Sequence, residues 1–235
     1  MTVKAGGGQR CDVYWAQLSW LAPAHVSLLS AAELDRRARF HRREDRDRFT
    51  LAAALLRVVL AERFESAPTE IQVDRTCDRC GEQHGRPRVP GYPVELSVSH
   101  SGEFAAVAVS TAGPTGIDVE HARPLDHRSL WGDVFGPEDD EARSLAAFYR
   151  GWTRKESILK ATGVGLALPM SAVRVTRTTE PPALLAYPGE PGLRARMADI
   201  PPAEEYAGAV SVLSAWPVVF REWHPRELLE AVGAG

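Results

Sequence analysis

Two acidic residues, Asp118 and Glu120, alternate with the apolar residues Ile117 and Val119. If residues 116–120 form a strand, Ile117 and Val119 face a core and the two carboxylates lie side by side on the opposite face. Neighbouring carboxylates repel each other unless a cation or a proton lies between them. Mg²⁺ prefers such oxygen ligands and completes its shell with water and substrate phosphates. The pattern indicates a magnesium site; a solvated acidic strand face is the alternative.

Trp152, Glu156 and Lys160 recur at every fourth position of a segment whose apolar spacing predicts a helix. Residues four apart line one face of a helix. A Glu followed by a Lys at this spacing is also a common stabilising surface pair, but Trp152 places this face at least partly inside the protein. A carboxylate beside an apolar ring can serve as a metal ligand or a general base.

The distribution of lysines singles out the same segment. Among the 28 basic residues, the lysines are Lys4, Lys155 and Lys160, and the others are arginines. An ammonium group is a compact charge on a flexible stem, and its pKa can be tuned. Two lysines this close together predict a specific role for an amine; a chance surface pair is the alternative.

Two further segments carry groups that suit an anion. His100 lies between Ser99 and Ser101 at the end of a predicted strand, where it could donate to a phosphate or tie down a hairpin. Arginines crowd the segment 36–48, and their guanidinium groups match phosphate oxygens. These are Arg36, Arg37, Arg39, Arg42, Arg43, Arg46 and Arg48. Three acidic residues interleave with them, which weakens the case for nucleic-acid binding.

Cys77, Cys80 and His84 are spaced like zinc ligands, with Cys11 a conceivable fourth. A structural zinc site needs four ligands, and a second Cys-x-x-Cys is missing from the sequence. We therefore expect a loop without metal here, with structural zinc as the alternative.

The elements that must position these residues follow from hydrophobic spacing and from turn and capping residues. Ser30 and Glu33 form a capping box that predicts a helix beginning near residue 30. Longer helices are predicted over 44–64 and 137–162, and strands over 11–18, 96–100, 104–110, 115–120, 172–175, 184–187 and 206–212. This mixture predicts an α+β fold with mostly antiparallel strands. A division near Gly113 would separate an N-terminal half, 1–113, from a C-terminal half, 114–235.

The overall composition is that of an ordinary globular chain. Its 235 residues are 44% hydrophobic and 25% charged, with a net charge of −3. This charge argues against a generally basic nucleic-acid binder. The sequence shows neither an apolar run long enough to span a membrane nor a secretory signal, and 3 cysteines make no disulfide framework. We expect a cytoplasmic protein.

Taken in order along the chain, these motifs resemble the 4′-phosphopantetheinyl transferases of the surfactin-synthetase (Sfp) type. The resemblance rests on Ser99-His100-Ser101, on Asp118-x-Glu120 and on Trp152-Thr153-x-Lys155-Glu156-x-x-x-Lys160. Supporting pieces are His41-x-x-Glu44-Asp45-x-x-Arg48, Gly85-Arg86-Pro87 and Gly163-x-Gly165-Leu166. The likeness spans roughly residues 36–170, and residues 206–212 look like the family's last core strand. In one departure, Glu33 stands where the family typically has a basic residue.

The resemblance implies a pseudo-dimer of two similar α+β halves, with the active site in the cleft between them. It implies a holo-carrier-protein synthase that moves 4′-phosphopantetheine from coenzyme A to a serine of an apo acyl or peptidyl carrier protein, releasing 3′,5′-ADP. Mg²⁺ would be the cofactor and coenzyme A the co-substrate. The chain would act as a monomer, without nucleic-acid or membrane partners.

The resemblance also implies roles for individual residues. Asp118, Glu120 and Glu156 would hold Mg²⁺ against the pyrophosphate, and Glu156 would also serve as the base for the attacking serine. Lys155 and Lys160 would neutralise phosphate charge, and Lys160 could protonate the leaving 3′,5′-ADP. The coenzyme A contacts would be Arg48 and His100 at the 3′-phosphate end, Ser99 beside them, and Arg36 and Arg86 farther out.

Three functions remain distinct expectations. The first is the transferase, acting on a peptidyl, acyl or aryl carrier of secondary metabolism, as in polyketide and nonribosomal peptide biosynthesis, or on the fatty-acid carrier. The second is a non-catalytic relative that binds coenzyme A or carrier proteins, against which the three acidic residues argue. The third is a nucleic-acid-binding module built on residues 36–48, whose binding would fall steeply with salt.

Overall fold

The computed structural model describes residues 9–77, 80–139 and 144–232, apart from the side chains of His84 and Leu166. Its first sheet has four strands in the order β11-β1-β5-β4. These strands are β1 (Arg10–Gln17), β4 (Glu95–Ser101), β5 (Phe104–Ser110) and β11 (Val219–Trp223). The β1–β11 pair is parallel and the other neighbours are antiparallel.

The second sheet has three antiparallel strands in the order β6-β10-β9. They are β6 (Thr115–His121), β9 (Ala195–Asp199) and β10 (Tyr206–Leu213). Two short antiparallel ribbons join β2 (Asp74–Thr76) to β3 (Gln83–Arg88) and β7 (Arg174–Val175) to β8 (Leu184–Ala186). The prediction of an α+β fold with mostly antiparallel strands is confirmed.

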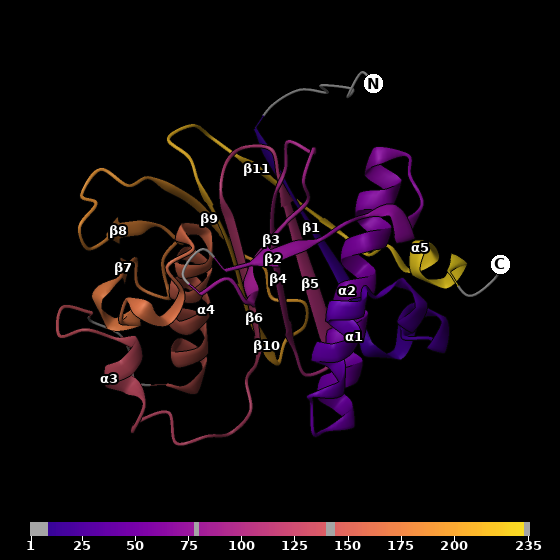
Figure 1. The fold of residues 1–235 in the computed structure, drawn as a ribbon. Helices are drawn as coiled ribbons and strands as arrows, with labels where there is room; N and C mark the ends of the chain where they lie inside the picture. Colours follow the sequence, from indigo (N-terminus) through magenta and orange to yellow (C-terminus); the bar gives the residue numbers. More distant parts are fainter. Residues whose placement is uncertain (1–8, 78–79, 140–143, 233–235) are drawn as a thin grey trace.

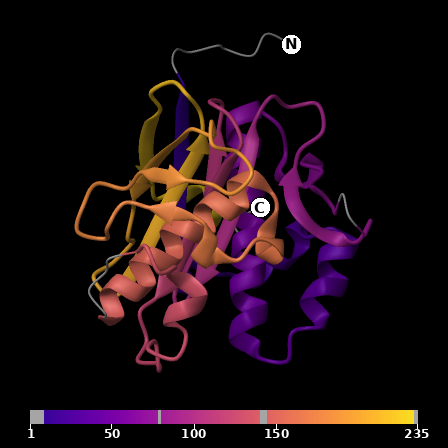
Figure 2. The ribbon, with the colours of Figure 1, turned by 90° about the vertical axis from the view of Figure 1, so that its left-hand side faces the viewer.

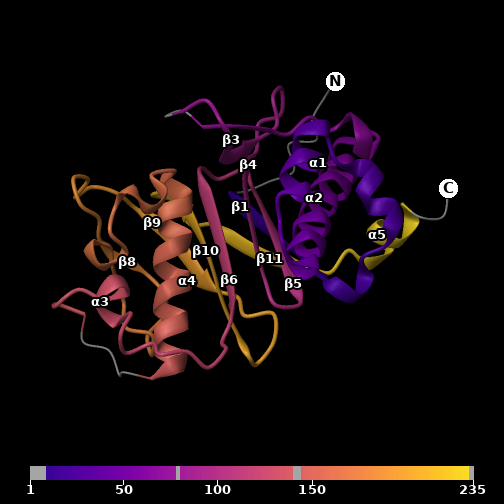
Figure 3. The same ribbon diagram turned by 60° about the horizontal axis from the view of Figure 1, so that its bottom comes forward.

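Two long helices flank the sheets on opposite sides. The strands lie between α2 (Arg43–Phe64), which packs on the first sheet, and α4 (Leu145–Thr162), which packs on the second (Figures 1 and 3). Figure 2 shows α4 in front of its sheet, with α1 and α2 to one side. The shorter helices are α1 (Ala31–Ala38), α3 (Trp131–Val134) and α5 (Arg226–Ala231). Turns of 3₁₀ helix lie at Leu18–Trp20, Pro23–Leu28, Pro68–Glu70, Gly165–Ala167 and Met170–Ala172. Every helix of the described chain is too short or too polar to serve as a membrane span.

Local signals in the sequence explain where the helices begin and end. The Ser30 hydroxyl accepts from the Glu33 amide, and the Glu33 carboxylate accepts from the Ser30 amide, so the predicted capping box begins α1. In α4, the Ser144 hydroxyl caps the first turn. The left-handed conformation of Gly163 ends α4, at φ 76°.

The predicted helix 137–162 is wrong in its first turns, because α4 begins at Leu145. Asp139 lies in a turn instead, where its carboxylate accepts from the Gly136 amide at 2.9 Å. Residues 140–143 lie outside the described part of the chain. The predicted start at residue 137 lies before the N-cap at Ser144.

The predicted strand 172–175 is shorter than expected, because a 3₁₀ turn runs to Ala172 and β7 holds only Arg174–Val175. Several elements that are short or pair at sheet edges were not predicted from the sequence. These are β2, β3, β9, β11, α3 and α5. Because β11 pairs with β1, residues 219–231 pack with the N-terminal half of the chain. The division near Gly113 stays a prediction.

Three large apolar clusters, with a small fourth one around Leu29, Phe49 and Ala53, form the core of the described chain. The first joins α2 to one face of the first sheet, through residues such as Leu55 and Val107. The second lies where the two sheets face each other and includes Trp15, Ile117 and Val119, all fully buried. The third packs α4, through Phe148 and other residues, against α3 and the segments that follow it. Ile117 and Val119 are therefore core residues, as their alternation with the acidic residues predicted.

Candidate active site

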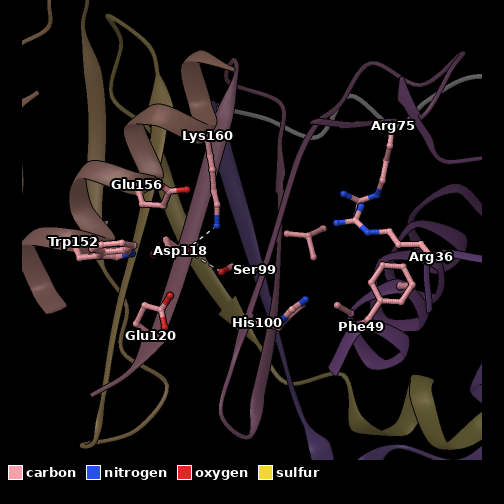
Figure 4. A pocket seen from close by; sticks show the side chains of 13 residues that line it. Arg36, Phe49, Arg75, Ser99, His100, Asp118, Glu120, Trp152, Glu156 and Lys160 are labelled. Carbon is pink, nitrogen blue, oxygen red and sulfur yellow. Dashed lines mark hydrogen bonds and ion pairs between the residues drawn. The ribbon is translucent and has the colours of Figure 1, made fainter. Parts of the chain in front are cut away.

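A cavity of about 380 Å³ lies between the side of the molecule that carries α2 and the side that carries α4 (Figure 4). Its acidic and lysine side chains come from β6 and α4, and its arginines and histidine come from α1, β2 and β4. The residues that line it are Arg36, Phe49, Ala52, Ala53, Arg75, Val98, Ser99, His100, Asp118, Glu120, Trp152, Glu156 and Lys160. The cavity thus collects most of the predicted site residues from segments far apart in the sequence.

Asp118 is the most constrained carboxylate of the site. It is 3% exposed, and its Oδ1 atom accepts from Ser99 Oγ at 3.0 Å and from Lys160 Nζ at 2.7 Å. Lys160 also donates to the Ile117 carbonyl at 3.0 Å. The contact between α4 and β6 that makes these bonds possible depends on Gly116. A side-chain carbon there would lie 2.6 Å from the Ala161 amide nitrogen.

The other two carboxylates hold their protons more tightly than usual. Burial, followed by the charge of Asp118, raises the pKa of Glu120 to about 7, although a hydrogen bond from Ser101 opposes the shift. Burial, with a smaller contribution from Asp118, also raises the pKa of Glu156. A cation between these groups would favour their charged forms.

The acidic side chains have oxygen atoms available for a cation. Asp118 Oδ2 and Glu156 Oε2 are buried, and neither has a hydrogen-bond partner among the described residues. A buried carboxylate oxygen without a partner is costly unless a proton or a cation satisfies it. The donor set is entirely oxygen, which suits Mg²⁺. No three His, Cys, Asp or Glu side chains of the described chain are drawn together into a closed ligand group.

The opposite side of the cavity is basic. Arg36 and Arg75 both face into it, and the Arg36 guanidinium lies 5.4 Å from the centre of the Phe49 ring (Figure 4). Burial, followed by the charge of Arg36, lowers the pKa of Arg75 to about 10. Arg75 Nε is buried without a hydrogen-bond partner among the described residues. Two guanidinium groups that repel each other in a cavity are typical of a site that binds an anion.

His100 lies at the rim between the two sides. Burial, followed by the charge of Lys160, lowers the pKa of His100 to about 4. The imidazole is therefore neutral at physiological pH and can donate one hydrogen bond to a phosphate.

Three predicted residues lie outside the cavity lining. Lys155 is fully buried, and its Nζ donates to the Val134 carbonyl at 2.7 Å and to Asp139 Oδ2 at 2.6 Å. The expectation that Lys155 neutralises phosphate charge is at odds with this placement, because the residue next to Glu156 faces another side of the helix. Arg48 donates to Asp45 and to the Gly102 carbonyl.

Arg86, the third of these residues, connects the two sides of the molecule. It donates to the Ala161 carbonyl at 2.9 Å and pairs with Glu95. Since Ala161 lies in α4 and Glu95 in β4, Arg86 links β3 to both of these elements.

No three of the possible zinc ligands come together among the described residues. Cys11 lies in the core and shares a hydrogen bond with Thr115, and burial raises the pKa of its thiol to about 12. The side chain of His84 lies outside the described residues. The structure therefore leaves zinc binding by Cys77, Cys80 and His84 untested.

Comparison with known proteins gives the family. Residues 114–211 match the model of the 4′-phosphopantetheinyl transferase superfamily. The chain is 33% identical over 213 residues to the 4′-phosphopantetheinyl transferase HetI of Nostoc, a match that covers 85% of this chain and 84% of the relative. The chain belongs to the 4′-phosphopantetheinyl transferase superfamily.

Other relatives match this chain over shorter stretches. It is 32% identical to a putative 4′-phosphopantetheinyl transferase of Synechocystis, over 63% of this chain and 62% of the relative. It is 27% identical to the transferase Sfp of Bacillus subtilis, over 64% of this chain and 67% of the relative. The chain therefore spans less than two thirds of the Synechocystis protein. The similarity to Sfp and to HetI confirms the predicted resemblance to Sfp-type enzymes.

Two residues that line the cavity, Arg75 and Phe49, are not among the predicted site residues. Phe49 belongs to the apolar spacing that predicts the helix 44–64, and Arg75 lies in the short strand β2, which no pattern predicted. The structure also explains Glu33, which stands in place of a basic residue. Its carboxylate caps α1 and pairs with the buried Arg57, at 2.6 Å between Arg57 Nη2 and Glu33 Oε2.

Proposed function

We propose that this chain transfers 4′-phosphopantetheine from coenzyme A to a serine of an apo carrier protein and releases 3′,5′-ADP, with Mg²⁺ as cofactor. The observation that carries the proposal is a single cavity with carboxylates at one side and unsatisfied guanidinium nitrogen at the other. Coenzyme A has a matching distribution of groups, because it bears a pyrophosphate and a separate 3′-phosphate.

The acidic side of the cavity suits the reacting pyrophosphate. Asp118, Glu120 and Glu156 would hold Mg²⁺ through the oxygen atoms described above. When bound, Mg²⁺ neutralises charge on the phosphate oxygens. Lys160 Nζ lies 2.7 Å from Asp118 and supplies a second positive charge beside them.

The basic side suits the adenosine 3′-phosphate. Arg36 and Arg75 would bind its oxygens, and neutral His100 would donate one hydrogen bond. We therefore add Arg75 to the coenzyme A contacts and keep Arg36 and His100 there, while Ser99 lies beside them with its hydroxyl proton donated to Asp118. Arg48 and Arg86 act on the site through the backbone carbonyls they bind.

In the reaction, the serine oxygen of the carrier protein forms a bond to the phosphorus that carries the pantetheine arm. The bond from that phosphorus to the oxygen of 3′,5′-ADP breaks. Glu156 accepts the serine proton as the general base. Lys160 stabilises the charge on the departing 3′,5′-ADP and can give it a proton.

We further propose that the molecule is a pseudo-dimer with its active site between the halves. The arrangement of a long helix on an antiparallel sheet occurs twice, as α2 on β1, β5 and β4 and as α4 on β6, β10 and β9. Residues of both halves line the cavity. A complete site on one chain supports a monomer, and the acidic composition supports protein rather than nucleic acid as the partner. The cytoplasmic location stays a prediction.

The test is the intact mass of an apo carrier protein after incubation with this chain, coenzyme A and Mg²⁺. We expect a mass gain of one phosphopantetheine group, abolished by EDTA and restored by excess Mg²⁺. Apo forms of an acyl, a peptidyl and an aryl carrier protein would be compared in the same assay. If none gains mass while the chain still binds coenzyme A, the binding-only relative is the better description.

A further inference from the structure

Strands β4 and β6 belong to different sheets but run beside each other. Serine side chains of β4 connect them by accepting hydrogen bonds from backbone amides of β6. The bonds run from Ile117 N to Ser97 Oγ (3.0 Å), from Val119 N to Ser99 Oγ (3.3 Å) and from His121 N to Ser101 Oγ (3.1 Å). The three serines alternate along β4 and so share one face of the strand. We call Ser97, Ser99 and Ser101 the serine ladder.

Two members of the serine ladder make a second hydrogen bond. Ser99 Oγ donates to Asp118 Oδ1 at 3.0 Å, and Ser101 Oγ donates to Glu120 Oε2 at 2.8 Å. A hydroxyl has one proton and two lone pairs, so each of these serines can accept from the backbone and donate to a carboxylate at once. The amide bond fixes the serine oxygen, and the proton is then directed at the carboxylate.

This arrangement orients two adjacent carboxylates that would otherwise repel each other. We infer that Ser99 and Ser101 are positioning residues that orient Asp118 and Glu120 toward a divalent cation. The inference rests on the proposed function, which places Mg²⁺ at these carboxylates. Metal-binding carboxylates are commonly held by such outer hydrogen bonds, and losing one typically costs about 10–100-fold in metal affinity.

A purely structural role of the serine ladder is the competing explanation, and the chain contains a matched control for it. Ser97 accepts the same kind of bond from β6 and is buried, at 3% exposure. Among the described residues, Ser97 Oγ accepts from the Ile117 amide and bonds to no carboxylate. Ser97→Ala therefore removes one hydrogen bond between β4 and β6 and leaves the bonds to the two carboxylates intact. Ser101→Ala removes one such bond between the strands together with the bond to Glu120.

The experiment measures Mn²⁺ binding by electron paramagnetic resonance, with and without coenzyme A, on the full chain. The proteins are the wild type, Ser97→Ala, Ser99→Ala, Ser101→Ala and Ser101→Thr, and each is also unfolded thermally to measure stability. Mn²⁺ serves as the probe because it takes the same oxygen ligands as Mg²⁺. The Mg²⁺ concentration for half-maximal transfer is a second readout.

We expect Ser99→Ala and Ser101→Ala to weaken Mn²⁺ binding by about 10-fold or more. The Mn²⁺ affinity of Ser97→Ala should stay within about 2-fold of the wild type, although its loss of thermal stability should be comparable to that of the other two alanine variants. Ser101→Thr keeps a hydroxyl and should bind Mn²⁺ like the wild type. If the wild type binds Mn²⁺ and the three alanine variants bind it equally well, the positioning role is wrong and the proposed function stands. If the wild type binds no Mn²⁺, with or without coenzyme A, the metal site itself is wrong and the positioning role is lost with it.

Discussion

Lys155 and Glu156 are neighbours in the sequence but lie in different surroundings on helix α4. Successive helical residues point about 100° apart, so only one of the two can face the cavity. Glu156 lines the cavity together with Trp152 and Lys160, each one turn away. Lys155 points into the C-terminal half, where its ammonium pairs with Asp139. At the scale of single residues, helical position therefore separates the lysine that is buried against Asp139 from the lysine that lines the cavity.

This separation predicts opposite effects for two alanine substitutions. Lys155→Ala should lower the free energy of unfolding by about 3–5 kcal/mol, because it leaves Asp139 buried without its partner. Lys160→Ala should cost less stability but slow transfer by about 10²–10³-fold, because it removes a charge beside the phosphates. Urea unfolding and initial transfer rates of both variants would test this. If the Lys155→Ala variant were well folded but inactive, Lys155 would instead have a role at the reacting phosphates.

Glu156 is predicted to be the proton acceptor. Glu156→Gln keeps the shape of the side chain but removes its basicity, so transfer should slow by about 10²–10⁴-fold while the protein stays folded. Glu230→Gln is the matched control, since it changes an exposed carboxylate of α5. Transfer rates and circular dichroism would be measured together. Near-normal rates for Glu156→Gln would contradict the assigned role.

Arg75 is predicted to recognise the 3′-phosphate. Arg75→Gln should raise KM for coenzyme A by about 10-fold or more, since a hydrogen bond to a charged group contributes about 1.5–3 kcal/mol. KM for dephospho-coenzyme A, which lacks the 3′-phosphate, should hardly change. Arg39→Gln, outside the cavity lining, is the control. An equal rise in KM for both substrates would mean that Arg75 binds another part of coenzyme A.

At the scale of elements, the site depends on how closely α4 approaches β6. Gly116 leaves room for this contact. A side-chain carbon at position 116 would lie 2.6 Å from the Ala161 amide nitrogen and 2.9 Å from Lys160 Cβ. Both neighbours belong to the turn of α4 that carries Lys160, so any shift of the helix also moves the site.

Gly116→Ala is therefore predicted to damage both stability and activity. Forcing a methyl group into this contact should cost about 1–3 kcal/mol and displace Glu156 and Lys160 relative to Asp118. Gly132→Ala is the matched control, because a side-chain carbon at this helical position meets nothing within 4 Å. Thermal unfolding and transfer rates would show whether the effect belongs to position 116. Equal behaviour of the two variants would contradict the packing argument.

At the scale of the whole molecule, the cavity brings charged groups of both halves into partly buried positions. Their ionisation therefore affects the stability of the entire fold. His100 shows this most clearly, because burial and the charge of Lys160 lower its pKa to about 4. An unfolded histidine titrates near 6.5, so between these values the unfolded chain binds a proton that the folded protein excludes.

The sign of the pH dependence follows directly. Where the unfolded chain binds more protons, stability rises with pH, so the contribution of His100 is complete above about pH 6.5 and is lost as pH falls toward 4. The slope for one group is at most about 1.4 kcal/mol per pH unit. His100→Gln should flatten the stability curve over this range. Urea unfolding at pH 4.5, 5.5 and 6.5 would test it, and identical slopes for both proteins would show that His100 does not contribute.

Much of the site could be predicted from the sequence because its residues follow local periodicities. Alternation along β6 separated Asp118 from Ile117, and four-residue spacing along α4 placed Glu156 with Lys160. Capping residues located the beginning of α1. These features depend on the strand and helix repeats, which are properties of neighbouring residues and need no information about distant contacts.

The tertiary structure alone decided which segments meet. Nothing local shows that Arg75 in the short strand β2 faces the same cavity as Arg36, or that β11 returns to pair with β1. Nor does a local pattern show that the serines of β4 hold the carboxylates of β6. The sequence by itself determined which residues can do the chemistry and on which face of its own element each one lies. Only the packing of the two sheets and their helices decided which of those residues share a site, because contacts between distant segments depend on burial and close approach across the whole chain.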